Sequence, residues 1–339
     1  MKDDPEKLLP WLRSELDWKE PVFAGALSGG NSNLTWRFES GSAACVVRTF
    51  PPATISPTAH RGIAREHAVL TAIEGHVRAP RVLGWGDEAS PLGRPFLVLE
   101  CIDGVAITDA LPDAYATDPG APDALGIELL DQLAAIHTMP LEDATLAAME
   151  RPGNFLERQI SRWLKVRSDA SVRELPQLFS LGQWLLDNLP PSPAPALVHG
   201  DYHLDNTLVS RTKPEILAVI DWEMATVGDP YTDLGLVLML WGAERRAEPP
   251  AFSHLQAISR APGVIDRRAL AARWSEKTGR ALDHIDYYMA YAFWRLAAIV
   301  EGAYCLYAQG EVDTPYARDL EYNVPALLEE AQQAARGNW

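Results

Sequence analysis

The residue types best suited to chemistry gather in one part of the chain. Asp201 and Asn206 lie five positions apart in one short loop, and Asp221 follows further along. Both aspartates come shortly after strand-like apolar runs. Phosphoryl transfer from a nucleotide needs one carboxylate that positions the attacking hydroxyl, and oxygen ligands that hold Mg²⁺ on the phosphates. Asp201 suits the first role, and Asn206 with Asp221 suits the second, so the pattern predicts a phosphoryl-transfer site.

The same stretch carries a second pattern, His-x-Asp-x-His, formed by His199, Asp201 and His203. Histidines and a carboxylate this close together are typical ligands of a metal-dependent hydrolase. That hypothesis leaves Asn206 and Asp221 without a role. The alternative is that His199 packs beneath the loop and orients it through hydrogen bonds. Serine or cysteine nucleophile chemistry is disfavoured, because the chain has no Gly-x-Ser-x-Gly or paired Cys/His motif.

The elements around these residues change character along the chain. The first third is typical of short strands joined by turn residues, with an embedded helix. Its expected helices are 5–17 and 61–73, and its expected strands are 22–27, 34–38, 44–49, 81–86 and 96–101. The Gly/Asn/Ser connections between the first three strands predict an antiparallel meander.

Beyond the Asp103-Gly104 pair, helical periodicity dominates. The expected helices are 124–137, 155–167, 172–188, 234–241, 267–278 and 285–308, interrupted by short strands at 196–198, 207–209 and 216–220. We therefore predict an α+β protein of two lobes joined near 102–104. Its domains are a β-rich lobe over 1–101 and a mainly helical lobe over 102–339. Asp229 and Asp233 stand at the start of one expected helix, where carboxylates cap helices.

The composition limits the classes of protein to consider. The chain has 339 residues, 47% of them hydrophobic, enough for a full core and about two domains. Its formal charge of −16 repels polyanions and argues against a nucleic-acid partner. The longest apolar run, 234–243, is shorter than the roughly 18–20 residues that span a bilayer, and the amino terminus lacks a signal-peptide pattern. With three scattered cysteines in neither disulfide nor zinc spacing, we expect a cytoplasmic protein.

The segment from His199 through Asn206, followed by Asp221-Trp222-Glu223, resembles the catalytic and metal loops of aminoglycoside phosphotransferases and their choline-kinase-like relatives. These small-molecule kinases share the two-lobed protein-kinase fold. The resemblance implies that Asp201 is the catalytic base and that Asn206 and Asp221 bind Mg²⁺. It also implies that residues 228–233 brace the catalytic loop.

The resemblance extends over the first third of the chain. It implies that residues 28–33 form the loop that covers the phosphates, and that Glu66 is the glutamate of the adjoining helix. It further implies that Glu100 and Ile102 offer backbone atoms to adenine. The residues of the loop are Ser28, Gly29, Gly30, Asn31, Ser32 and Asn33. Such a composition is also typical of a plain hairpin turn, and both interpretations stay open here.

Arg48 departs from the general kinase pattern, which has lysine on this strand. Arginine can also reach phosphate oxygens, but its planar fork differs from an ammonium point charge. The branch of the family associated with acyl-CoA dehydrogenases often has arginine here, followed by a proline-rich turn like Phe50-Pro51-Pro52. We expect Arg48 to pair with Glu66 beside the phosphates. The other hypothesis is an ordinary surface salt bridge.

Basic residues of the helical lobe bear on the acceptor. Arg158, Arg162 and Lys165 recur at helical spacing, which fits either a solvated helix face or a site for an anionic substrate such as a coenzyme A derivative. Arg295 lies inside an apolar run and needs a partner or a ligand. The acidic residues that could pair with it are Asp283, Asp286 and Glu301. Further arginines lie near the stripe in sequence, namely Arg151, Arg167 and Arg173.

These observations lead us to expect a kinase that moves the γ-phosphoryl group of ATP, or of GTP, to a hydroxyl of a small molecule. The acceptor could be aminoglycoside-like, an amino alcohol or a hydroxyacyl thioester. The mixture of arginines with apolar residues favours a less cationic, partly apolar compound. A nucleotide-binding pseudokinase or scaffold module is the alternative from another class, and Arg48 is the feature that supports it. The oligomeric state is left open.

Overall fold

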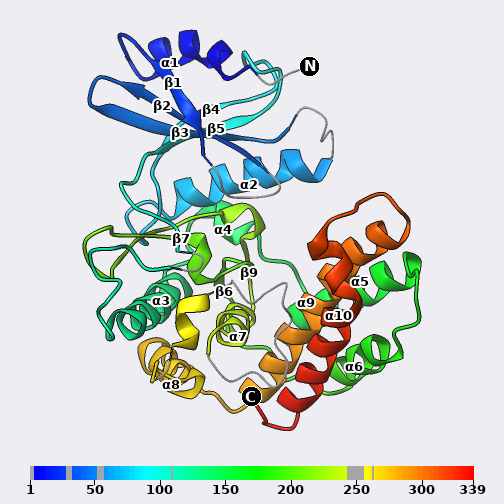
Figure 1. The fold of residues 1–339 in the computed structure, drawn as a ribbon. Coiled ribbons are helices and arrows are strands. Elements are labelled where there is room, and N and C mark those ends of the chain that lie inside the picture. The colour runs from blue at the N-terminus through cyan, green and yellow to red at the C-terminus, as the bar shows by residue number, and fades with distance from the viewer. Residues whose placement is uncertain (1–3, 28–32, 52–56, 108–109, 243–255, 262) are drawn as a thin grey trace.

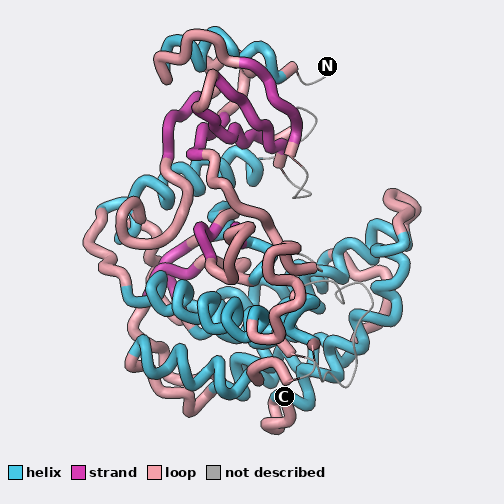
Figure 2. Tube along the Cα trace, turned by 60° about the vertical axis from the view of Figure 1, so that its left-hand side comes forward, coloured by secondary structure: helices cyan, strands magenta, loops and turns pink. Residues whose placement is uncertain are grey.

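The computed structural model describes residues 4–27, 33–51, 57–107, 110–242, 256–261 and 263–339. The chain forms a β-rich amino-terminal lobe and a mainly helical carboxyl-terminal lobe (Figure 1). The tube in Figure 2 shows the same division, with the main sheet at one end of the molecule and most helices at the other. The expected α+β class with its two lobes is therefore confirmed.

The amino-terminal lobe is built on one antiparallel sheet of five strands in the order β1-β2-β3-β5-β4. The strands are β1 (Val22–Ala26), β2 (Leu34–Ser40), β3 (Ala43–Thr49), β4 (Val82–Gly86) and β5 (Phe96–Glu100). Along β3, Cys45 and Val47 are fully buried, while Val46 and Arg48 point to the other face, as a strand's period of two requires.

The two faces of this sheet have different partners. Cys45 and Val47 pack with Leu8 and Leu12, which lie on the 3-10 helix η1 (Pro5–Leu8) and on helix α1 (Leu9–Glu15). Helix α2 (Pro57–Ala72) lies on the side of the sheet that faces the helical lobe (Figure 1). The alternation along β3 therefore turns Arg48 away from the first core and toward α2.

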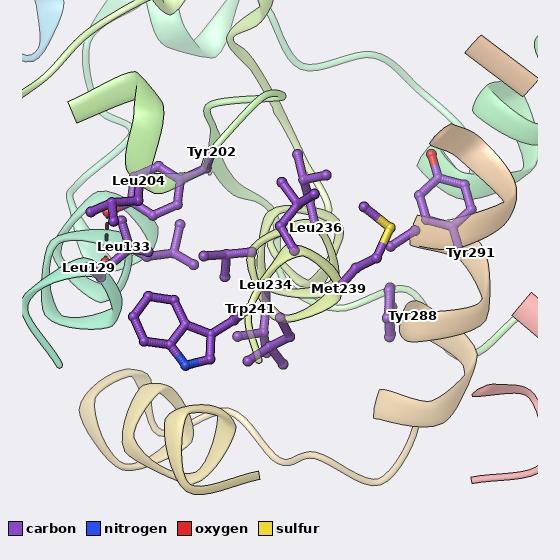
Figure 3. Packing of buried hydrophobic residues seen from close by; sticks show 14 of the residues in the cluster. Leu129, Leu133, Tyr202, Leu204, Leu234, Leu236, Met239, Trp241, Tyr288 and Tyr291 are labelled. Atoms are coloured by element: carbon purple, nitrogen blue, oxygen red, sulfur yellow. Dashed lines mark hydrogen bonds between the residues drawn. The ribbon is translucent and has the colours of Figure 1, made fainter. Parts of the chain in front are cut away.

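The helical lobe is organised around α7 (Tyr231–Leu240), which is buried from Thr232 to Leu240. Figure 3 shows α7 between Leu129 and Leu133 of one neighbour and Tyr288 and Tyr291 of another. Those neighbours are α3 (Ala121–Thr138) and α9 (Ile285–Ala308). The remaining helices are α4 (Ala144–Ala147), α5 (Phe155–Asp169), α6 (Pro176–Asp187), η5 (Ala257–Arg260), α8 (Arg267–Thr278) and α10 (Pro315–Ala334).

Two short antiparallel strand pairs stand between the sheet and these helices. One joins β6 (Ala196–Val198) to β9 (Thr226–Gly228), and the other joins β7 (Thr207–Val209) to β8 (Ile216–Val219). The 3-10 turns η2 (Leu204–Asn206) and η3 (Trp222–Met224) lie at their ends. Strand β6 ends directly before His199, and β8 ends two residues before Asp221. The strand pairs therefore fix both chemistry-bearing loops against the helical core.

The elements expected from sequence form at or near their predicted positions, with some corrections. The helix expected at 172–188 begins only at Pro176, because proline's fixed φ favours the first helical turn. Among the described residues, the elements that were not expected are α4, β9, α10 and the 3-10 turns η2, η3 and η5. Helix α10 contains Pro325, which argues against a helix when the sequence is considered alone.

The structure also tests the predictions made for the three cysteines and for the longest apolar run. Cys45, Cys101 and Cys305 are free thiols, as expected. The apolar run that begins at Leu234 forms the buried helix α7. In the part of the chain that the structure describes, no helix is long and apolar enough to cross a membrane.

The close approach of α7 to α9 can be tested at Gly235. A Cβ there would lie 2.7 Å from the backbone oxygen of Tyr288, so the two helices would have to separate. We expect Gly235→Ala to lower the free energy of unfolding by about 1–3 kcal/mol. The matched control is Gly302→Ala in α9, whose Cβ meets only the guanidinium end of Arg167, at 3.4 Å. Urea unfolding should show the control unchanged or slightly more stable, and equal losses in both variants would contradict the packing argument.

Candidate active site

One buried carboxylate holds the backbone of the loop that starts at His199. Asp233 of α7 accepts the N–H of His199 on Oδ2 at 2.7 Å and the N–H of Gly200 on Oδ1 at 2.9 Å. Nε2 of His137 lies 3.3 Å from the same Oδ2. Burial raises the pKa of Asp233, but these contacts outweigh it and the net pKa lies below the usual value. The expectation that Asp233 caps α7 is therefore wrong, because its side chain braces the loop.

Gly200 and Asp229 complete this brace. Gly200 has φ of 88°, and a Cβ there would lie 2.7 Å from the carbonyl oxygen of Met224, so glycine is required at this turn. Asp229 accepts the N–H of Tyr231 at 3.0 Å and the hydroxyl of Tyr288 at 2.7 Å. Asp229 therefore accepts the first N–H of α7, although the N-cap position itself is occupied by Pro230.

His199 is fully buried, and both of its ring nitrogens are engaged within the protein. Nε2 lies 2.9 Å from the carbonyl oxygen of Ile220, and Nδ1 lies 3.3 Å from the backbone nitrogen of Asp201. A carbonyl only accepts and an amide N–H only donates, so the ring hydrogen is on Nε2. His199 therefore orients the loop from below, which argues against the metal-hydrolase hypothesis.

Asp201 presents a carboxylate that is half exposed at the surface of the loop. Nδ2 of Asn206 donates to its Oδ2 at 3.1 Å and to its backbone oxygen at 2.9 Å. Burial raises the pKa of Asp201, but the hydrogen bond and charge of His203 outweigh it and lower the pKa to about 2. Asp201 is therefore ionised at neutral pH, the form that can accept a hydrogen bond from a hydroxyl group.

His203 lies between two carboxylates, and sequence reasoning gave it no role beyond the hydrolase pattern. Its Nδ1 is 3.2 Å from Oδ2 of Asp205, and its Nε2 is 3.7 Å from Oδ2 of Asp201. Burial lowers the pKa of His203, but the two carboxylates raise it to about 9. Nε2 also lies 3.2 Å from Nδ2 of Asn206, so protonated His203 leaves both amide hydrogens of Asn206 to Asp201. His203 thereby stabilises the ionised form of Asp201.

Asp221 is held beside Asn206 by the backbone. The N–H of Ile220 donates to the carbonyl oxygen of Asn206 at 3.0 Å, which joins the two loops. Asp221 itself has φ of 70° and ψ of 55°, a left-handed conformation that is rare for a residue other than glycine. Carboxylate and amide oxygens suit Mg²⁺, which takes few protein ligands and completes its shell with phosphates and water. The donor set of Asn206 and Asp221 fits that ion.

Arg48 connects the two lobes at this point. Its Nη1 donates to Oε1 of Glu66 at 2.6 Å, and its Nη2 donates to Oδ1 of Asp221 at 2.8 Å. The exposed fraction is 12% for the Arg48 side chain and 1% for that of Glu66. The pairing with Glu66 is therefore confirmed, and the hypothesis of an ordinary surface salt bridge is wrong. Burial raises the pKa of Glu66 to about 7 against the opposing charge of Arg48.

The ion-pair cluster leaves one donor without a partner. Nε of Arg48 is buried and makes no hydrogen bond within the described residues. A buried donor without a partner costs about 1–3 kcal/mol. An unpaired guanidinium N–H next to Asp221 is a fitting donor for a phosphate oxygen. The cluster therefore fits a nucleotide phosphate with its Mg²⁺.

The expected phosphate-covering loop lies mostly outside the described residues, which resume at Asn33. Nδ2 of Asn33 donates to Oε2 of Glu223 at 2.7 Å, so the end of this loop contacts the helical lobe. Glu223 stands in the Asp-Trp-Glu motif, but sequence reasoning gave it no role. The contact could not be found from the sequence, because Asn33 and Glu223 are 190 positions apart.

The residues expected at the adenine site lie at the end of β5. The N–H of Glu100 donates to the carbonyl oxygen of Arg81 at 2.9 Å, and the side chains of the two residues also pair. The carbonyl oxygen of Ile102 accepts the N–H of Gly104 at 3.0 Å. The backbone N–H of Glu100 is therefore already hydrogen-bonded to Arg81 within the amino-terminal lobe.

A cavity of about 250 Å³ lies next to the catalytic loop, between α2, α5 and α9. Gly200 lines it, together with the predicted acceptor residues Arg158, Arg162 and Arg295. Two further arginines, Arg65 and Arg151, also line it, and we name it the arginine cavity. Arg151 is close to the predicted stripe in sequence. Arg65 comes from the other lobe, and nothing in the sequence pattern signals its position.

Other basic residues of the stripe lie elsewhere. Lys165 pairs with Asp169 and is mostly exposed. Arg167 is buried, with Nη1 4.0 Å from Sγ of Cys305. Arg173 pairs with Glu301 and stacks on the ring of Tyr304. Of the three stripe residues, Arg158 and Arg162 line the arginine cavity, whereas Lys165 does not and lies on a solvated helix face.

Arg295 has a partner that the sequence did not suggest. Its Nη2 donates to the carbonyl oxygen of Gly200 at 3.0 Å. Glu301 pairs with Arg173, and Asp286 accepts the indole N–H of Trp339, so these two expected partners are wrong. Arg295 therefore both lines the cavity and contacts the residue before Asp201.

Comparisons with known proteins agree with this geometry. A profile described as the phosphotransferase enzyme family matches residues 24–275. Acyl-CoA dehydrogenase family member 10 of Mus musculus is 30% identical over 281 residues, which are 81% of this chain and 26% of that protein. A crystal structure from Ralstonia eutropha, provisionally assigned as an aminoglycoside phosphotransferase, has a TM-score of 0.84 at 27% identity and covers 99% of each chain. The GDP complex of aminoglycoside 2'-phosphotransferase-IIIa has a TM-score of 0.62 at 17% identity, over 99% of this chain and 100% of that chain.

The two lobes and the loops between them are those of the kinase-like phosphotransferases, so the expected fold is confirmed. This chain belongs to the phosphotransferase enzyme family, whose profile covers well over half of it. The expected family resemblance, including the branch associated with acyl-CoA dehydrogenases, is likewise confirmed. The chain spans about a quarter of the length of the mouse relative that it matches.

The brace at Asp233 predicts a large loss of stability on substitution. Asp233→Asn replaces one acceptor oxygen by an NH₂ group that would face a backbone N–H, so both a hydrogen bond and the charge are lost. We expect the free energy of unfolding in urea to fall by about 2–3 kcal/mol. Asp319→Asn, at an exposed position on α10, is the control and should be unchanged. Equal stability of the two variants would mean that Asp233 does not hold the loop.

The raised pKa of His203 predicts a pH dependence of stability. The folded state keeps a proton on His203 up to about pH 9, whereas the unfolded state loses it near 6.5. The stabilisation is therefore complete below pH 6.5 and disappears as the pH rises to about 9, a change of up to about 3 kcal/mol. Urea unfolding of wild type and His203→Gln across this range measures it. The difference between the two proteins should shrink with rising pH, and a constant difference would contradict the assignment.

Proposed function

We propose that this chain transfers the γ-phosphoryl group of ATP, or of GTP, to a hydroxyl of a small molecule. The observation that carries the proposal is the convergence of Asp201, Asn206, Asp221 and Arg48. Side-chain hydrogen bonds join Asn206 to Asp201 and Arg48 to Asp221, and the backbone N–H of Ile220 joins the Asp221 loop to Asn206. In the transfer, the acceptor oxygen bonds to the γ-phosphorus as the bond between that phosphorus and its bridging oxygen breaks. The nucleoside diphosphate leaves with the bridging oxygen, and the acceptor proton passes toward Asp201.

In this proposal Asp201 is the catalytic base. Its ionised carboxylate orients the acceptor hydroxyl, and His203 keeps it ionised. No covalent intermediate on the enzyme is needed, because positioning and charge neutralisation supply the acceleration. Arg295 would contribute by fixing the carbonyl of Gly200, the residue before Asp201.

The nucleotide site combines residues of both lobes. Arg48 would donate its unpaired Nε–H to a phosphate oxygen while Glu66 holds the guanidinium in place. Mg²⁺, held by Asn206 and Asp221, would neutralise charge on the phosphates. Residues 28–33 would cover the phosphates, with Asn33 fixed by Glu223. Ile102, at the proposed boundary between the domains 1–101 and 102–339, would meet adenine through its backbone.

The acceptor in this proposal is an aminoglycoside-like compound, an amino alcohol or a hydroxyacyl thioester. The GDP-bound neighbour supports a nucleotide donor, and its name supports an aminoglycoside acceptor for that protein alone. The five arginines of the arginine cavity favour an anionic acceptor over a polycationic one.

A nucleotide-binding pseudokinase or scaffold is the second candidate. The ion pair between Arg48 and Asp221 favours it, because Oδ1 of the proposed metal ligand already accepts from the guanidinium. Mg²⁺ would have to share that carboxylate or displace Arg48. The presence of Asp201, Asn206 and Asp221 together favours the enzyme, since a scaffold needs no base.

The two candidates are separated by calorimetric titration of ATP and GTP, with and without Mg²⁺, followed by a transfer assay. Asp201→Asn should bind nucleotide like wild type and lose transfer by about 10²-fold or more. Asp221→Asn should lose the part of nucleotide binding that depends on Mg²⁺. Asp319→Asn, on the exposed side of α10, is the control for both and should match wild type.

Full transferase activity in both site variants would overturn the assignment of the residues. Nucleotide binding without transfer to any acceptor class would support the scaffold. If neither nucleotide binds, the fold is used for something other than phosphoryl transfer.

A further inference from the structure

The lining of the arginine cavity is unusual for a chain with a formal charge of −16. Five of the residues that line it are arginines, and none of the described lining residues is Asp or Glu. They come from separate parts of the chain, namely Arg65, Arg151, Arg158, Arg162 and Arg295. The fold therefore concentrates positive charge at one concave place on an otherwise acidic protein.

Within the described residues, none of these five arginines lies within ion-pair distance of a carboxylate. Arg158 donates to the carbonyl oxygens of Pro152 and Gly153, both at 2.6 Å. Arg162 lies over the ring of Trp163, 5.5 Å from its centroid. Carbonyl and ring contacts hold guanidinium groups in place but bring no negative charge. Glu223 and Asp201 act on Arg65 and Arg295 from beyond ion-pair distance, so five positive charges meet two negative ones around the cavity.

Arg65 shows the resulting repulsion most clearly. Burial lowers its pKa first, and the charges of Arg151, Arg61 and Arg162 lower it further, which outweighs the opposing charge of Glu223. Within the described residues its side chain makes one hydrogen bond, a long one of 3.4 Å to the carbonyl oxygen of Glu223. An oxyanion between these side chains would relieve the repulsion and accept from several guanidinium forks at once. A polycationic acceptor would instead add to the repulsion.

The other residues that line the cavity indicate what else the ligand contains. Phe155, Met224, Val227 and Tyr291 give it apolar surface. Gly200 lines the same cavity and precedes Asp201, so a hydroxyl group at that end would lie near the proposed base. A compound that fills the cavity would thus have an anionic group, an apolar part and a hydroxyl group.

Arg65 adds a connection between the lobes. It lies on α2 directly before Glu66, and the hydrogen bonds of Glu66 and Arg48 lead on to Asp221. Arg151, Arg158 and Arg162 belong to the helical lobe. A single anion among them would contact both lobes at once.

We propose that the arginine cavity is the acceptor site and that the acceptor is a hydroxylated organic oxyanion. Its carboxylate or phosphate group would bind between Arg65, Arg151 and Arg162, and its hydroxyl group would face Asp201. The role of this compound as phosphoryl acceptor rests on the proposed function. The binding of the oxyanion can be tested without a nucleotide.

The test uses three small probes that share one aromatic ring and differ in charge: phenyl phosphate, benzoate and benzylamine. Calorimetric titration of the full chain, without nucleotide or Mg²⁺, should rank phenyl phosphate above benzoate and show no binding of benzylamine. In the double variant Arg151→Gln, Arg162→Gln, both positions being exposed and outside the core, phenyl phosphate affinity should fall about tenfold or more. Arg318→Gln, an exposed arginine on α10, removes a like charge elsewhere and should keep the wild-type affinity.

Several outcomes would overturn the proposal. They are benzylamine binding as tightly as phenyl phosphate, no binding of either anion, and an unchanged affinity in the double variant. Binding of benzoate alone would assign the site to a carboxylate, and preference for phenyl phosphate would assign it to a phosphate group. A parallel ATP titration separates this result from the proposed function, because the double variant should bind nucleotide like wild type. If neither the wild type nor the variants bind ATP, the kinase assignment is refuted. The affinity for phenyl phosphate still tests the oxyanion site independently.

Discussion

The buried carboxylate of Asp233 is the constraint on which the rest of the site depends. It accepts the backbone N–H groups of His199 and Gly200 and thereby ties the loop that carries Asp201 to α7, a helix buried from Thr232 to Leu240. The loop then needs glycine at 200, because a side chain there would meet the backbone of Met224. A carboxylate that receives two backbone donors in a buried place is strongly held, so Asp201 begins from a fixed position.

The second constraint is the guanidinium of Arg48, which spans the two lobes. Its two terminal nitrogens reach Glu66 and Asp221 at the same time, a geometry that one ammonium group does not reproduce. Arginine at this position therefore shapes the electrostatics of the site, because its second terminal nitrogen is paired with the Asp221 carboxylate. The unpaired Nε–H shows that the fork still has a donor to offer. The pairing of Arg48 with Asp221 supports the scaffold interpretation, whereas the unpaired Nε–H of Arg48 supports the enzyme interpretation.

Charge is distributed unevenly over this protein, and the unevenness has a physical consequence. An acidic surface surrounds a cavity with five arginines and no carboxylate among its described lining residues. Because guanidinium groups without counter-ions repel one another, this arrangement costs stability unless an anion fills it. The family profile and the fold place the chain among phosphotransferases, but they do not determine the acceptor, which depends on the side chains that line the cavity.

The sequence by itself determined the two-lobed class, nearly all of the strands and long helices, and the order of Asp201, Asn206 and Asp221. These follow from periodicity and from residues close together along the chain, which local rules can address. Helix α10 was missed because Pro325 argues against a helix, and tertiary packing overrides that preference. The family resemblance implied that residues 228–233 brace the loop, but only the tertiary structure decided that Asp233 does so through the N–H groups of His199 and Gly200. It also decided that Arg48 reaches Asp221 and that Arg65 joins the arginines of the other lobe. Each of these joins residues far apart in sequence, and no spacing rule encodes such a contact.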